Sequence, residues 1–121
     1  MRILALVVVI LAGCATPSGD AAKNAPQATF SSTKPVPVVL ACVQRRLDMF
    51  EWGHCPHGGT TIRPNDDHSA LAVEGQCGGY ATLEGQQKGD QSVYELRVAR
   101  RADWGLCSMS GVFRELARLC M

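Results

Sequence analysis

The second half of the chain alternates between apolar and polar residues, as half-buried β-strands do. Residues 92–100 are the clearest case, because apolar Tyr94, Leu96 and Val98 recur at every second position. Residues 60–63, 69–76 and 80–86 fit three further strands, and apolar or small residues define their inner faces: Leu71, Val73, Gly75, Ala81 and Leu83. Short turn sequences rich in Asn, Asp and Gly separate the segments, so we predict a four-stranded antiparallel meander.

Two segments instead carry apolar residues at helical spacing. The first helix is predicted over residues 38–50, with a stripe formed by Val39, Cys42, Val43, Leu47 and Phe50. The second is predicted over residues 111–120 behind a Ser110 cap, with a stripe of Val112, Phe113, Leu116, Ala117 and Cys120. The apolar face of a meander needs a cover. We therefore expect an α+β fold in which an N-terminal and a C-terminal helix cover one face of the meander.

The start of the chain has a different pattern. An unbroken apolar run covers residues 3–11 and leads into Leu11, Ala12, Gly13 and Cys14. The run is too short to span a bilayer, which takes roughly 20 apolar residues, but it suits the core of a secretory signal. These residues alone leave open an ordinary signal peptide cut elsewhere and an uncleaved anchor.

The Leu11-Ala12-Gly13-Cys14 sequence resembles the lipobox of bacterial lipoproteins. The resemblance implies that residues 1–13 are removed as a signal peptide. It also implies a diacylglyceryl group on the Cys14 thiol and a fatty acid such as palmitate on the new amine. Ala15 at the second mature position indicates the outer membrane, facing the periplasm, with the inner membrane as the alternative. Such a lipid anchor would be the chain's contact with the membrane.

The remaining chain divides into a tether and a domain. Residues 14–36 are rich in Pro, Ser, Thr and Ala without a hydrophobic period, which predicts a lipidated flexible tether. Residues 37–121 are predicted to form one small α+β domain. Arg2 is the only charged residue of the signal, so the rest of the chain carries basic and acidic residues in equal number. That balance argues against a nucleic-acid partner.

Five cysteines follow Cys14, in a compartment where disulfides persist. The predicted topology places Cys42 and Cys120 at one end of the two helices, and we favour a disulfide between them. The other three cysteines gather at the opposite end of the sheet. We favour Cys55–Cys77 there, with Cys107 unpaired, although a bond from Cys107 to Cys77 or Cys55 is nearly as well supported.

The same end of the sheet is a candidate metal site. The ligands would come from His54, Cys55, His57, Cys77 and Cys107, and thiolate with imidazole suits zinc or cuprous copper. An oxidising compartment and the absence of a paired C-x-x-C spacing favour a structural disulfide instead. We therefore predict no cofactor.

Other side chains point to surface roles. Trp52 and Trp104 lie in predicted loops and are possible anchors for a partner. A basic strip could form from Arg97, Arg100, Arg101, Arg114 and Arg118. The acidic and histidine residues at 66–68 fit a hairpin turn better than a catalytic site. We identify no catalytic residues and expect that the protein is not an enzyme.

The domain also loosely resembles small uncharacterised lipoproteins of Gram-negative bacteria that have one cysteine in a first helix and another at the C-terminus. That family has no settled activity. The function expected is a non-catalytic, membrane-anchored accessory or interaction lipoprotein of the cell envelope, which docks an envelope protein or glycan. The alternatives are periplasmic metal binding by the Cys/His cluster and inhibition of an enzyme.

Overall fold

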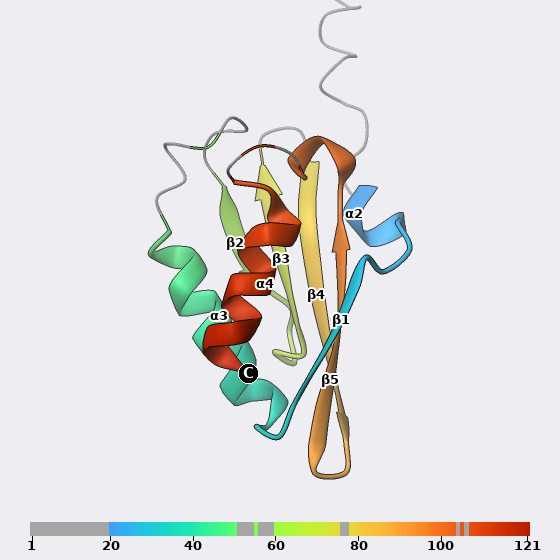
Figure 1. Cartoon of the computed structure of the whole chain (residues 1–121), viewed down its shortest axis with the longest axis vertical. Coiled ribbons are helices and arrows are strands. Elements are labelled where there is room, and N and C mark those ends of the chain that lie inside the picture. The colour runs from blue at the N-terminus through green and yellow to red at the C-terminus, as the bar shows by residue number, and fades with distance from the viewer. Residues whose placement is uncertain (1–19, 51–54, 56–59, 76–77, 104, 106) are drawn as a thin grey trace, which may run out of the picture.

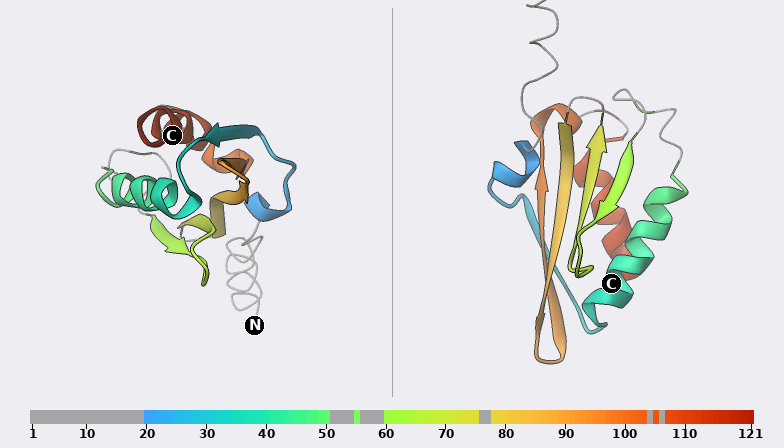
Figure 2. Two further views of the ribbon diagram at one scale, coloured as in Figure 1. Left: turned by 90° about the horizontal axis from the view of Figure 1, so that it is seen from below. Right: turned by 180° about the vertical axis from the view of Figure 1, so that it is seen from behind.

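A computed structural model of the chain describes residues 20–50, 55, 60–75, 78–103, 105 and 107–121. Five antiparallel strands form one sheet in the order β1-β5-β4-β3-β2, and two long helices, α3 and α4, cover one of its faces (Figures 1 and 2). The elements are α2 (Asp20–Lys23), β1 (Ala28–Ser32), α3 (Val36–Asp48), β2 (Thr61–Pro64), β3 (Ala70–Gly75), β4 (Gly78–Lys88), β5 (Gln91–Val98), the 3-10 turn η2 (Arg100–Ala102) and α4 (Met109–Cys120).

The predicted meander is confirmed as β2, β3, β4 and β5, each paired antiparallel with the next. The predicted inner face is also confirmed, because alternate residues of β3, β4 and β5 enter the core: Leu71, Val73, Ala81, Leu83, Tyr94, Leu96 and Val98. These strands place one apolar face against the helices and leave one polar face open.

Both predicted helices are present, with two differences. The helix α3 ends at Asp48, so Phe50 lies beyond its last turn and is exposed instead of joining the buried stripe. The cap of α4 is Ser108, whose Oγ accepts a hydrogen bond from Gly111 N (3.2 Å). Ser110 instead donates to the Asp103 carboxylate (2.8 Å).

The prediction of a flexible tether over residues 14–36 is wrong from residue 20 onward. The strand β1 pairs with β5 and adds a fifth strand to the sheet. It packs Ala28 and Phe30 against the core, which repays the entropy of ordering this segment. The short helix α2 lies on the face of the sheet opposite α3 and α4 (Figure 2), and Ala21 is fully buried there. The domain therefore includes elements before residue 37, namely α2 and β1.

Buried hydroxyl groups join β1 and β5 at the end of the sheet where α3 begins. Tyr94 Oη donates to Ser92 Oγ (2.9 Å), and Ser92 Oγ donates to the Lys34 carbonyl (2.7 Å). Burial raises the pKa of the Tyr94 hydroxyl, because the ionised form would lose its hydration. Beside this pair, Ser32 Oγ donates to the Met121 carbonyl (3.1 Å), which ties the end of the chain to β1.

The predicted Cys42–Cys120 disulfide is confirmed, with 5.7 Å between the two Cα atoms. It joins α3 to α4 across 78 residues of sequence. Because both helices also pack on the sheet, this covalent bond fixes the spacing of the helix layer on which the candidate site lies.

Candidate functional site

The outer surface of the helix layer carries a groove between α3 and α4. Seven residues line this α3–α4 groove: Arg46, Met49, Phe50, Val112, Glu115, Leu116 and Leu119. Its volume is about 270 Å³. The two helices run side by side in antiparallel directions (Figure 1), so residues at the end of α3 face residues along α4.

The groove is apolar although it faces solvent. The side chains of Met49, Leu119 and Phe50 are 76%, 39% and 36% exposed. A single exposed apolar side chain is ordinary in a folded protein, whereas a contiguous set marks an interaction site. Methionine also adapts its shape to different partners. The groove therefore has the surface chemistry of a docking site for apolar side chains.

Charged residues form the rim of the groove. The Arg118 guanidinium donates to both carboxylate oxygens of Glu115, through Nε at 3.1 Å and through Nη2. These hydrogen bonds hold the pKa of the Glu115 carboxyl below its usual range. Arg46 borders the groove from the side of α3. An apolar centre with a polar rim is the usual anatomy of a protein interface.

The groove is held in shape by the disulfide of the helix layer. Cys120 follows Leu119 directly, and Cys42 lies one helical turn before Arg46. A partner would therefore meet a site that is already formed. Preorganisation of this kind lowers the entropic cost of binding.

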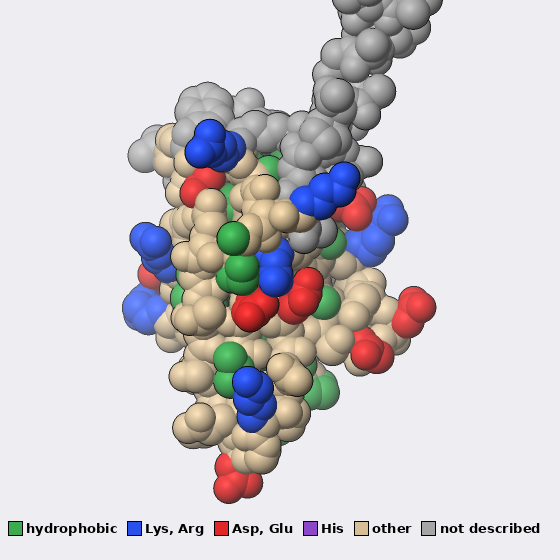
Figure 3. Space-filling view, turned by 90° about the vertical axis from the view of Figure 1, so that its right-hand side faces the viewer, with side chains coloured by type: hydrophobic (Ala, Val, Ile, Leu, Met, Phe, Trp, Pro, Cys, Tyr) green, Lys and Arg blue, Asp and Glu red, His purple; other side chains and the backbone are tan. Residues whose placement is uncertain are grey.

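Three members of the possible basic strip, Arg97, Arg114 and Arg118, do not share one surface. Arg97 extends from β5 on the open face of the sheet, where it pairs with Glu95 (3.0 Å) and Glu84 (3.6 Å). Arg118 and Arg114 extend from α4, which lies on the other side of the sheet. In Figure 3 acidic and basic side chains lie next to one another in the middle of the open face.

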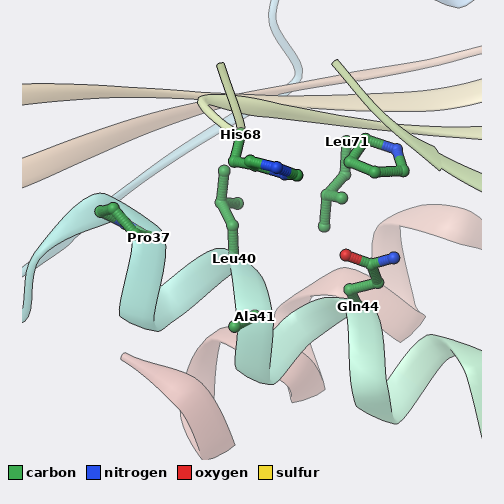
Figure 4. A pocket seen from close by; sticks show the side chains of 7 residues that line it. Pro37, Leu40, Ala41, Gln44, His68 and Leu71 are labelled. Atoms are coloured by element: carbon green, nitrogen blue, oxygen red, sulfur yellow. The ribbon is translucent and has the colours of Figure 1, made fainter. Parts of the chain in front are cut away.

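A second, smaller hollow lies between α3 and the turn that joins β2 to β3 (Figure 4). Its volume is about 160 Å³, and its lining consists of Pro37, Leu40, Ala41, Gln44, Pro64, His68 and Leu71. His68 has a φ of 57° and donates its backbone N–H to the Asn65 carbonyl (3.2 Å). The lining contains one imidazole and one amide, without a carboxylate, thiol or hydroxyl group. This arrangement supports the interpretation of residues 66–68 as a turn.

The turn itself is built by polar side chains, as its sequence predicts. The Asn65 carbonyl Oδ1 accepts from Ser69 N and Ala70 N (both 2.9 Å). Asp67 accepts from the Ser69 hydroxyl (2.6 Å), and this hydrogen bond, with one from the Ser69 backbone, lowers the pKa of the Asp67 carboxyl. These carboxylate and hydroxyl groups are used in holding the turn.

The predicted Cys55–Cys77 disulfide is wrong. Cys55 bonds to Cys107, with 5.5 Å between the Cα atoms, so Cys107 is not unpaired. The preferred pairing assumed that Ile62 lies opposite Leu71, whereas Ile62 pairs with Val73. Cys77 itself lies outside the described residues.

The same disulfide changes the candidate metal site. A sulfur atom in a disulfide is not a thiolate, so Cys55 and Cys107 are not available as ligands in this state. His54, His57 and Cys77 lie outside the described residues. Within the part of the chain that the structure describes, no three His, Cys, Asp or Glu residues are grouped as a metal site.

Two further expectations fall outside the described ranges: Trp52 and Trp104 as partner contacts, and Cys14 with the preceding lipobox. None of the helices in the described ranges is long and apolar enough to cross a membrane. The α3–α4 groove itself was not predicted. Its signal in the sequence is Met49 and Leu119, two large apolar residues that lie off the buried stripes.

The chain matches no known protein family, no curated protein and no solved structure. Function must therefore be inferred from the residues and surfaces of this molecule.

Proposed function

We propose that the protein is a non-catalytic, membrane-anchored accessory lipoprotein of the cell envelope. In this proposal Cys14 carries the lipid, the domain faces the periplasm from the outer membrane, and the α3–α4 groove docks a protein partner. The observation that carries the docking role is the exposure of Met49 and Leu119 in a groove that a disulfide holds in shape.

The lipobox supports the anchor. Two or three acyl chains hold a protein firmly at a membrane, whereas one chain binds only marginally. The two disulfides support a location in an oxidising compartment, because cytosolic thiols are kept reduced. Both arguments favour the cell envelope over the cytosol.

The chemistry of the groove indicates what it would bind. Its floor is apolar and its rim carries the Arg46 guanidinium and the Glu115–Arg118 ion pair. Such a surface fits a protein segment that inserts apolar side chains and places polar groups around them. It fits a glycan less well, since it offers few hydrogen-bonding groups at its centre. A protein partner is therefore preferred over a cell-wall sugar.

A paired comparison tests the docking role. The lipidated protein is purified from envelopes after mild chemical cross-linking, in its natural form and as Met49→Ser/Leu119→Ser. We expect the natural protein to recover one partner in stoichiometric amount. The double variant should recover at least tenfold less of that partner. Thr61→Ser/Thr29→Ser, on exposed positions of the open sheet face, is the control and should retain the partner. Equal recovery with all three forms would contradict the proposal.

The identity of the partner also separates docking from inhibition. An envelope component of the same cell supports the accessory role, whereas a secreted enzyme that loses activity when bound supports an inhibitor.

Intact mass of the mature protein tests the anchor independently. We expect a mass increment of acyl chains on the peptide that begins at Cys14, and an unmodified Cys14 would contradict it.

A further inference from the structure

The chain between the proposed lipid and the folded domain is short. The described fold includes α2, and only residues 15–19 separate Cys14 from Asp20, the first residue of α2. Each residue extends a chain by at most about 3.6 Å, so the Cα atoms of Cys14 and Asp20 are at most about 22 Å apart. A tether that ran to residue 36 would have let the domain move and turn freely above the membrane.

The tether enters the fold at one end of the sheet, where α2 is fixed by the residues that follow it. Asn24 Nδ2 donates to the Val98 carbonyl (2.8 Å), and Gln27 N donates to the Leu96 carbonyl (2.8 Å). Val98 is the last residue of β5, and Arg100 begins η2 directly beyond it. We call this region, formed by α2 and η2, the tethered end.

The other end of the sheet lies far from the membrane attachment. The hairpin between β4 and β5 turns after Lys88 and returns at Gln91. Seven residue steps along β5 separate Gln91 from Val98, which is roughly 23 Å at the rise of a β-strand. The long axis of the molecule runs along these strands (Figure 1). A short tether at one end of that axis therefore restrains the direction in which the domain points.

The tethered end offers cationic side chains to a membrane surface. Lys23 and Arg100 are both exposed, and neither forms an ion pair with another residue in the described ranges. The neighbouring Asp103 carboxylate is turned into the fold, where it accepts from Ser110 N (2.9 Å) and Ser110 Oγ (2.8 Å).

We propose that the tethered end lies against the anionic headgroups of the membrane that holds Cys14, with Lys23 and Arg100 facing lipid phosphates. The domain then stands with its strands directed away from the bilayer and the β4–β5 hairpin as its most distant part. Basic residues close to an anionic surface are attracted to it over a distance of about 10 Å. This inference rests on the proposed lipidation of Cys14.

Two exposed residues provide a matched pair of probe positions. Ala25 lies beside α2 at the tethered end and Lys88 lies at the distant hairpin, and both are exposed. An environment-sensitive fluorescent amino acid replaces Ala25 or Lys88 in the full lipidated protein, so that Lys23 and Arg100 are retained. Each form is bound to vesicles of phosphatidylethanolamine and phosphatidylglycerol that contain a lipid with a nitroxide on its headgroup. Flotation with the vesicles first establishes that the protein is anchored.

We expect quenching at position 25 to exceed quenching at position 88 at least threefold. Inserting twenty Gly and Ser residues between positions 19 and 20, together with Lys23→Gln/Arg100→Gln, should reduce that ratio below two in the corresponding probe forms. Anchored protein with equal quenching at the two positions, or stronger quenching at position 88, would overturn the orientation but leave the anchor intact. Protein that carries no acyl chain and does not float would overturn the anchor, and this inference with it.

Discussion

The open face of the sheet and the outer surface of the helix layer differ in whether their side chains have partners within the fold. On the open face of the sheet, charges from neighbouring strands pair with one another: Arg63 with Glu74 (3.5 Å), and Arg97 with both Glu84 and Glu95. On the helix layer, the apolar side chains of the α3–α4 groove face solvent. The charges named on the open face are thus paired within the fold, whereas the apolar groove gains free energy when another surface covers it.

This difference separates structural from functional positions in a small domain. Surface ion pairs of the kind found on the open face contribute little to the free energy of unfolding, so their residues tolerate substitution. An apolar groove exposed to water contributes nothing to folding, and it is maintained here by a disulfide between the two helices that form it. The exposed residues of the helix layer are therefore where substitutions should affect binding, and the residues buried between the helices and the sheet are where they should affect folding.

Removing the disulfide of the helix layer should have the largest effect. For Cys42→Ala/Cys120→Ala we expect a loss of roughly 4 kcal/mol in the free energy of unfolding, because the bond closes a long loop in the unfolded chain. Urea unfolding followed by circular dichroism measures the loss. Cys55→Ala/Cys107→Ala is the matched control for loop closure alone. The account is contradicted if only the control variant is destabilised.

Neighbouring residues of β4 compare the two faces of the sheet directly. Leu83 is buried beneath the helices, and Glu84 points to the open face. We expect Leu83→Ala to lower the free energy of unfolding by about 3 kcal/mol through lost burial and the cavity left behind. Glu84→Ala should cost less than about 1 kcal/mol. Equal losses in urea unfolding would show that the assignment of the faces is wrong.

The charge pairs of the open face should contribute less still. Glu84→Gln/Glu95→Gln removes both acidic partners of Arg97, whose side chain is only 19% exposed. We expect a loss of about 1 kcal/mol or less in the free energy of unfolding, decreasing when salt is raised. A loss of several kcal/mol that persists in high salt would mean that this face contains a buried charge network instead of surface pairs.

The groove residues should leave folding almost unchanged. For Met49→Ser/Leu119→Ser we expect the free energy of unfolding to fall by no more than about 1 kcal/mol, since Met49 is largely exposed and Leu119 is partly exposed in the folded protein. Thermal unfolding of the domain measures this change. A strong loss of stability would assign the two residues to the core and remove the basis for a docking site.

The smallest expected effect concerns the rim of the groove. Hydrogen bonds from Arg118 lower the pKa of the Glu115 carboxyl in the folded protein. The stabilisation from this pair is therefore present above the ordinary pKa of a glutamate and is lost as the pH falls through the lowered value. Carboxyl NMR titration should show the pKa of Glu115 rising in Arg118→Gln. An unchanged pKa would show that the two side chains do not pair in solution.

Much of the fold follows from local patterns in the sequence. The meander and the two long helices are predictable because their apolar residues recur at periods of two and of about 3.6. The Cys42–Cys120 bond is predictable because both cysteines lie on buried helix stripes at the same end of the layer. These features depend on residues that are close together in the chain or on the direction in which consecutive elements run.

The features that were missed depend on contacts between distant segments. The strand β1 has only one large apolar residue, Phe30, and owes its form to pairing with β5. The helix α2 has only four residues, too few for a periodic pattern, and its Ala21 is buried. The preferred pairing of the second disulfide relied on an assumed register of β2 against β3. The observed register differs from it by two residues. The groove depends on the angle between two helices, which no local pattern specifies.

The measurement that most directly tests docking by the groove is site-specific photocross-linking in living cells. Benzoylphenylalanine replaces Leu119 in the groove or Glu84 on the open face, two exposed positions on opposite sides of the domain. Docking through the helix layer predicts a discrete adduct of defined mass from position 119 and none from position 84. An adduct from position 84 alone, or the same diffuse labelling from both positions, would contradict the account.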